Sequence, residues 1–199
     1  HLEATAGNYA MGRVTGALSG PLSNTLAYRV AGTVHQRDGY LQNLAGKDLN
    51  DADEWNLVGK LLWEPDDQFS MLAKVSHVRR DMDCCAPDSV HDPRAEQAII
   101  DRGLPPLGTD PFDHRTAQDT LTPFKQASSA VSLHIDYDTG WGTLQSITAW
   151  DEYDVDSSQE TSRSVLDTTF LNQPQSGDSF SQEPVSYTHL TLPTKPSGG

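Results

Sequence analysis

The segments LAYRVAGTV (residues 26–34), EWNLVGKLLWE (54–64) and FSMLAKVS (69–76) decide the fold of this chain. In each of them apolar side chains recur at every second position, which is the period of two of a β-strand. Each segment has about ten residues, the length that a tilted strand needs to cross a bilayer. A face of aromatic and aliphatic side chains set against a face of charged and polar ones is typical of a barrel strand between lipid and a wet lumen.

The connections between the expected strands alternate between short and long. The short ones are GPLSN (20–24), EPDDQ (64–68) and DTGWG (138–142). Outer-membrane barrels have this asymmetry, with tight turns on one side and long loops on the other. The long connections, which we expect to form an external vestibule, are residues 37–53, 79–129 and 157–178.

A helix is expected inside the longest loop. In DPRAEQAIIDRG (92–103), Asp92 suits the N-cap, Pro93 the first helical position and Gly103 the position just past the end. Further strands are expected at AVSLHIDYD (130–138) and TLQSITAWDEYDVD (143–156), and a last one begins at Ser179. The phase of the 143–156 strand is ambiguous, because apolar residues fall on both of its faces.

The composition restricts the function. The chain has 199 residues, of which 36% are hydrophobic, and a formal net charge of −14. No run approaches the ~18 consecutive apolar residues of a spanning helix. The remaining way for the chain to cross a membrane is therefore as a closed β-sheet. The excess of Asp and Glu argues against a nucleic-acid partner. No HExxH, GxSxG or phosphate-binding glycine motif occurs, so neither enzymatic activity nor a cofactor is predicted.

Two groups of side chains are candidates for metal binding. The first combines thiols, imidazoles and carboxylates and consists of His77, Asp81, Asp83, Cys84, Cys85 and His91. Adjacent cysteines lack the spacing of zinc sites, which favours a loop disulfide of Cys84 and Cys85, with each other or with a distant partner. The second is the acidic series Asp136, Asp138, Asp151, Glu152, Asp154 and Asp156. It lacks the EF-hand pattern, which favours a solvated surface. No metal site is therefore predicted.

Aromatic residues gather towards the ends of the expected strands. Those near the short turns are Trp63, Phe69 and Trp141, and those near the long loops are Tyr40, Trp55, Trp150 and Tyr153. Two such groups indicate aromatic girdles at the two membrane interfaces. The alternative is aromatic packing inside a soluble β-sandwich, because aromatic residues favour strands in general.

The order of these features resembles the first part of the barrel of a TonB-dependent outer-membrane receptor. The resemblance runs through GNY, SGPLSNTLAYRVAG, QRDGYLQN, DLNDADEW, GKLLWEPDD, SLHIDYDTGWGTLQSITAW, DSSQE and SFSQE, between residues 7 and 183. It implies an all-β fold: an antiparallel transmembrane β-barrel of about 22 strands, of which this chain supplies about eight as an open curved sheet. The chain begins in mid-strand, so we expect a fragment.

The resemblance also implies a function at the bacterial outer membrane. Such receptors take up a scarce ligand, most often a ferric siderophore, sometimes a cobalamin, a glycan or another metal chelate. Their partners are the TonB energising complex, which acts through a plug domain that this chain lacks, and the lipid of the outer membrane. By the alternation, the residues that face the lumen and the ligand path are Arg29, His35, Lys60, Lys74, His134 and Asp136.

Residues 184–199 depart from the family pattern. The sequence PVSYTHLTLPTKPSGG resembles translated adapter read-through, so the expected division is a partial receptor barrel over 1–183 and a non-native tail over 184–199. Two alternatives to the receptor stay open. One is a complete eight-stranded outer-membrane barrel of the structural or adhesin kind, since about eight strands can close. The other is a soluble β-sandwich that binds carbohydrate.

Overall fold

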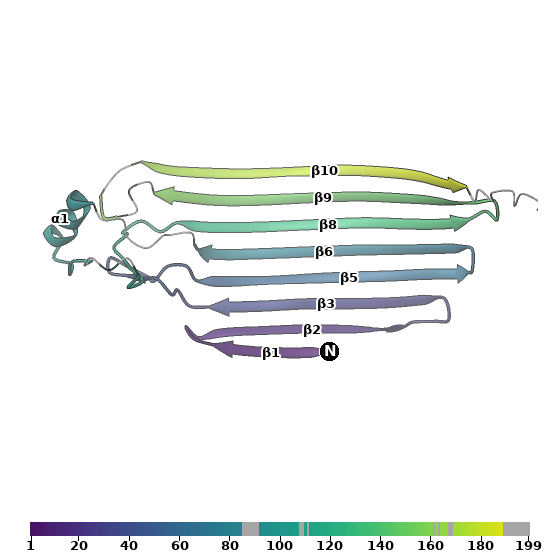
Figure 1. Ribbon diagram of the computed structural model, residues 1–199, viewed down its shortest axis with the longest axis horizontal. Coiled ribbons are helices and arrows are strands. Elements are labelled where there is room, and N and C mark those ends of the chain that lie inside the picture. The colour runs from purple at the N-terminus through teal and green to yellow at the C-terminus, as the bar shows by residue number, and fades with distance from the viewer. Residues whose placement is uncertain are drawn as a thin grey trace, which may run out of the picture.

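The computed structural model describes residues 1–84, 92–107, 110, 112–160, 162, 164–166 and 169–188. Eight strands form one antiparallel sheet in which each strand pairs with the next along the chain (Figure 1). They are β1 (Leu2–Gly7), β2 (Met11–Pro21), β3 (Leu26–Arg37), β5 (Ala52–Asp66), β6 (Phe69–Asp83), β8 (Pro123–Asp138), β9 (Gly142–Glu160) and β10 (Phe170–Thr188). The chain is therefore nearly all antiparallel β, as predicted.

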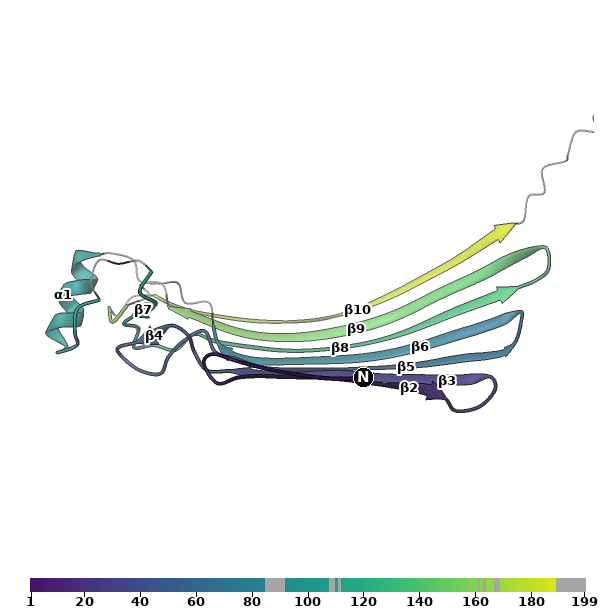
Figure 2. The same ribbon diagram turned by 60° about the horizontal axis from the view of Figure 1, so that its bottom comes forward.

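The sheet is open and curved (Figure 2). Its outer strands are β1 and β10, which pair with β2 and β9 only. An eight-stranded barrel that closed on itself would pair these two strands with each other. The predicted open curved sheet of a barrel fragment is confirmed, and the complete eight-stranded barrel is not what the described residues form.

Short turns join the strands at the end of the sheet that lies away from α1 (Figure 1). Asp66 closes one of them, because its Oδ1 accepts hydrogen bonds from the backbone N–H groups of Gln68 (2.9 Å) and Phe69 (3.0 Å). In another, Oδ1 of Asp138 accepts from the N–H of Gly140 (2.8 Å), whose φ of 83° suits glycine. The long connections lie at the opposite end, together with the β1–β2 turn.

The register places the predicted apolar positions on one face of the sheet, which we call the apolar face. Residues opposite each other in an antiparallel pair point to the same face. The members of this face that the alternation predicted include Leu26, Tyr28, Val30, Val34, Trp55, Leu57, Leu61, Trp63, Phe69, Met71, Ala73, Val75, Val131, Leu133, Ile135 and Tyr137. In β9, Leu144 is opposite Tyr137 and Trp150 is opposite Val131, which fixes the ambiguous phase of that strand.

The apolar face is exposed. Leu57, Val75 and Val131 keep 49%, 54% and 49% of their surface accessible. In the described part of the chain, the buried hydrophobic residues all lie outside the eight-stranded sheet. A β-sandwich buries such a face against a second sheet, and among the described residues the second sheet consists of just β4 (Gln42–Asn43) and β7 (Arg115–Thr116). The arrangement is a single layer rather than a sandwich.

The aromatic girdles are predicted correctly only in part. Trp63 and Phe69 pack edge to face at the short turns, with ring centroids 5.4 Å apart. Tyr153 is opposite Ser128, on the face away from Trp150, so its assignment to a lipid-facing girdle is wrong. The assignment of Tyr40 is wrong as well, because it belongs to a loop and packs there against Tyr9 and His114.

Several strands extend further than predicted. β6 continues to Asp83 and β8 begins at Pro123, so the longest connection is shorter than 79–129. β9 continues to Glu160 and β10 begins at Phe170, so the loop predicted over 157–178 and the strand start predicted at Ser179 are wrong. The reason is physical, since backbone groups pair whatever the side chains are, and these polar stretches carry no apolar alternation.

The end of β10 falls in the proposed tail. Residues 184–188 pair with residues 142–146 of β9, and residues 189–199 lie outside the described part of the chain. Backbone pairing of a terminal strand does not depend on the origin of its sequence. The division between residues 183 and 184 therefore stays a prediction.

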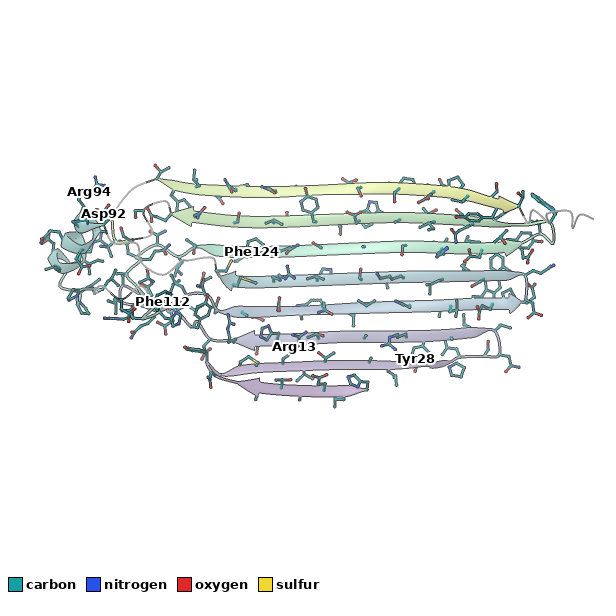
Figure 3. The ribbon with its side chains drawn as sticks, viewed as in Figure 1. Arg13, Tyr28, Asp92, Arg94, Phe112 and Phe124 are labelled. Atoms are coloured by element: carbon teal, nitrogen blue, oxygen red, sulfur yellow. The ribbon has the colours of Figure 1, made fainter. Side chains whose placement is uncertain are left out.

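The predicted helix is confirmed as α1 (Pro93–Asp101). Asp92 caps it, with its Oδ1 accepting from the N–H of Arg94 at 2.9 Å, and Gly103 follows its end with a φ of 75°. Figure 3 shows Asp92 and Arg94 at this helix, beyond the end of the sheet. Among the described residues, no helix has the length and apolar character to cross a membrane.

The β1–β2 turn stores backbone strain. Tyr9 and Ala10 have φ values of 59° and 50°, and the N–H of Met11 donates to the carbonyl of Asn8 at 3.2 Å. We expect Ala10→Gly to stabilise the protein by about 0.5–1 kcal/mol, because glycine adopts this conformation without a Cβ clash. Thermal unfolding in detergent measures the change. Ala17→Gly inside β2 is the control, and a turn without strain would leave Ala10→Gly no more stable than wild type.

Candidate functional site

The face opposite the apolar face, here called the polar face, holds all the predicted lumen-facing residues. Arg29 is opposite Lys60, which is opposite Lys74, and His35 is opposite Glu54. The remaining predicted residues, His134 and Asp136, are opposite Leu72 and Ser70. All six share one face, although they come from β3, β5, β6 and β8.

A hydrogen-bonded row crosses four strands of the polar face near its loop end. Nδ1 of His35 lies 3.0 Å from Oε1 of Glu54, and Nε of Arg80 donates to Oε2 of Glu54 at 3.2 Å. Nη1 of Arg80 also donates to Oε1 of Gln126 at 3.1 Å. Of these four residues, only His35 is predicted from the sequence. A register extended beyond the apolar segments would have identified Glu54, Arg80 and Gln126.

We expect Glu54→Gln to destabilise the protein by about 0.5–1 kcal/mol, because it removes the charge from both hydrogen bonds of a side chain that is only one-third exposed (34%). The unfolding temperature in detergent measures the loss. Asp53→Asn, the neighbouring position on the other face, is the matched control and should change little. Equal effects of the two variants would mean that the row does not stabilise the sheet.

The turn end of the polar face is acidic. Nε2 of Gln145 donates to Oδ1 of Asp136 at 2.9 Å, and Nε2 of His134 lies 3.5 Å from Oδ2 of the same carboxylate. A shallow depression beside them is lined by further carboxylates, among them Glu64 and Asp138. The two predicted residues of β8 therefore form one polar cluster at the end of the sheet where the short turns lie.

The connections at the other end pack into one small unit, here called the loop module, which comprises the described residues of 38–51, 92–122 and 162–166. Figure 1 shows it beyond the strand ends, with α1 at its outer side. Its hydrophobic core consists of Ile99, Leu107, Ala117 and Val165, with Leu44, Ala45, Ala98 and Leu104 packed against it. The predicted gathering of the long loops at one end is confirmed in this form.

Asn43 connects the parts of the loop module. Its side-chain amide donates to the carbonyls of Gln118 (2.7 Å) and Lys47 (3.2 Å), and its Oδ1 accepts from the N–H groups of Gln118 (2.9 Å) and Ala45 (3.2 Å). Only 5% of its surface is exposed. Because the parallel pair of β4 and β7 has just two residues per strand, this one side chain contributes as many hydrogen bonds as a short ladder.

Ion pairs fix the loop module to the sheet. Nζ of Lys47 donates to Oδ2 of Asp51 (2.7 Å) and to Oδ2 of Asp83 at the end of β6 (2.9 Å). These hydrogen bonds, with Asp51 first, hold the pKa of the Lys47 amine well above its usual value. The N–H of Asn50 also donates to the carbonyl of Asp83 at 2.7 Å. The module is thus positioned relative to the strands.

The two candidate metal groups do not assemble as units among the described residues. Asp83 bonds Lys47, while Nδ1 of His77 lies 3.0 Å from Oγ of Ser129 and its ring packs, tilted by 35°, against Trp55. The acidic series is divided by the alternation, with Asp136, Asp138 and Asp151 on the polar face and Glu152, Asp154 and Asp156 on the apolar side. Cys84 is disulfide-bonded. Cys85 and His91 lie outside the described residues, so the pairing of the two cysteines stays a prediction.

The fold is that of part of an outer-membrane receptor barrel. The structure is similar to the ferric-catecholate import receptor Fiu from E. coli K12 in its closed form, with a TM-score of 0.55 and 10% identity over 89% of this chain and 26% of the receptor. A mutant of the ferric enterobactin receptor PfeA from Pseudomonas aeruginosa matches with a TM-score of 0.48 and 15% identity over 83% of this chain and 24% of that one. The chain therefore spans about a quarter of the length of these structures.

Comparison by sequence gives no family. No protein-family model matches the chain, and no curated protein matches it. At the identities above, the structural likeness shows the fold alone. The features of this chain that bear on its function are therefore the two faces of the sheet and the loop module.

Proposed function

We propose that this chain is part of a TonB-dependent receptor that imports a scarce ligand, most often a ferric siderophore in such receptors, across the bacterial outer membrane. The observation that carries the proposal is the single-layer sheet with an exposed apolar face and a charged opposite face. Soluble proteins rarely expose contiguous apolar patches larger than a few hundred Å², whereas a barrel strand needs such a surface towards lipid.

The structural likeness to Fiu supports the choice of cargo. Fiu is a ferric-catecholate import receptor, and this chain has the same fold over 89% of its length. In the proposed receptor, the loop module belongs to the external vestibule, and the six polar-face residues line the ligand path. Cys84 and Cys85 form a staple in the longest loop. None of these residues is assigned a catalytic role.

Uptake of a radiolabelled ferric siderophore tests the function. The complete coding sequence that contains residues 1–183 is expressed in a Gram-negative host that lacks its own siderophore receptors, with and without TonB. We expect uptake that requires both the receptor and TonB. Uptake that is the same without TonB, or none with any of a panel of ferric chelates, cobalamin and glycans, would contradict the proposal.

The proposed domain division is tested on the source DNA. We propose that residues 1–183 belong to the receptor barrel and that 184–199 do not. Reading through the codon of Glu183 should give a sequence that differs from residues 184–199 and continues with further strands. A plug domain should be encoded upstream. If residues 184–199 are encoded there contiguously, the tail assignment is wrong.

A further inference from the structure

The polar face holds a row of cations that nothing in the described structure neutralises. Arg29, Lys60 and Lys74 are directly opposite one another on β3, β5 and β6. All three are exposed, and none has an ion pair or a side-chain hydrogen bond to another described residue. We call these three residues the basic row. Like charges placed directly opposite each other destabilise a sheet, so the row has a cost that some other interaction must offset.

The surroundings of the basic row are neutral. The positions beside it on the polar face are Ala31, Val58 and Ser76 towards the loop end and Ala27, Leu62 and Leu72 towards the turn end. Two other cations of this face, Arg80 and Arg37, do have partners, whereas Arg13 of β2, opposite His35, has no ion pair or side-chain hydrogen bond to another described residue. Arg80 bonds Glu54, and Nη2 of Arg37 donates to the carbonyl of Asn50 at 2.8 Å. The basic row is therefore a local feature, and it stands out in a chain whose net charge is −14.

We propose that the basic row binds a partner that carries two or more oxyanion groups, carboxylate or phosphate. Neighbouring strands lie about 4.8 Å apart, so the row offers positive charges at that spacing across three strands. A multivalent anion matches this spacing and forms charge-assisted hydrogen bonds with guanidinium and ammonium groups. The inference rests on the proposed function, because it takes the polar face as the wall of an enclosed lumen.

The oxyanion has two sources, a dissolved anion that enters the lumen or acidic side chains of protein that fills it. An experiment on the purified full-length receptor in detergent distinguishes the two sources from each other. Its unfolding temperature is measured at fixed ionic strength with and without citrate or pyrophosphate, for wild type and for Lys60→Gln/Lys74→Gln. Arg79→Gln, on the other face of β6, is the control for loss of a positive charge outside the row, and Lys60→Arg keeps the charge of the row.

If a dissolved anion is the partner, adding citrate or pyrophosphate raises the unfolding temperature of wild type and of Lys60→Arg. The double variant then binds citrate or pyrophosphate at least tenfold more weakly. If protein carboxylates are the partner, the added anions do not change the unfolding temperature. The double variant then unfolds several degrees below wild type, while Arg79→Gln stays near wild type. The proposal is overturned if added anions have no effect and the double variant is as stable as wild type or more stable.

The outcome of this stability measurement does not depend on the outcome of the uptake experiment that tests the proposed function. The stability measurement needs neither TonB nor a transported ligand, so it can succeed when uptake fails. Conversely, TonB-dependent uptake with an inert basic row would leave the proposed function intact and remove only this inference.

Discussion

Val131→Arg should reduce the amount of folded protein in the outer membrane at least about tenfold, because an arginine in the middle of a lipid-facing strand costs about 2–4 kcal/mol. Val131 is 49% exposed and lies on the apolar face, opposite Val75 on one side and Trp150 on the other. The heat-modifiable band of the full-length receptor in outer-membrane fractions measures the folded amount.

Ala130→Arg is the matched control for this substitution. It is the preceding residue of β8 and faces the polar side, opposite Ser76 and Asp151. An arginine at this position meets water and a carboxylate, so folding should be nearly unchanged. If both variants fold equally well, or if Ala130→Arg is the more damaging, the assignment of the apolar face to lipid is wrong.

Asn43→Asp should open the loop module without unfolding the sheet. The substitution keeps the shape of the side chain but removes both hydrogen bonds that its amide donates to the carbonyls of Gln118 and Lys47. It also places a carboxylate at a buried position, since Asn43 exposes only 5% of its surface. Unpaired buried polar groups cost about 1–3 kcal/mol each, and a buried charge costs more, so we expect a loss of about 3 kcal/mol or more in the module.

Amide hydrogen exchange measures this opening. The N–H groups of Leu44 and Gln118, which bond Thr116 and Asn43, should exchange roughly a hundredfold faster, as follows from the expected loss. The N–H groups of β5 and β6 should not change, because the sheet does not depend on the module for its pairing. Asn172→Asp on exposed β10 is the control. Unchanged exchange at Leu44 would show that Asn43 does not hold the module together.

The sequence predicted the strands in which apolar and polar side chains alternate. Between Leu26 and Tyr137 the apolar alternation is regular, and both the register and the division into faces follow from it. The same rule failed beyond Asp156, where β9 and β10 are rich in Ser and Gln. Water contacts both faces of such a stretch, so no period of two is imposed on its sequence.

The packing of the loop module could not be predicted from the sequence, for a different reason. Its core joins Ile99, Ala117 and Val165 from distant connections, and Asn43 and Gln118 are 75 residues apart. Contacts of this kind follow from where the strands bring the loops, not from a local pattern. The helix was the exception, because its cap at Asp92 and its end at Gly103 are local signals. The six polar-face residues were found for the same local reason.

The most direct test of the lipid-facing assignment of the apolar face is the solvent and lipid accessibility of β5 in a bilayer. Spin labels are placed one at a time from Asn56 to Trp63 in the full-length receptor in liposomes, with Cys84 and Cys85 replaced by serine. We predict high collision rates with oxygen at positions 57, 59, 61 and 63, and with a water-soluble nickel chelate at positions 56, 58, 60 and 62. Rates without a period of two, or the two sets exchanged, would contradict the claim that the apolar face contacts lipid.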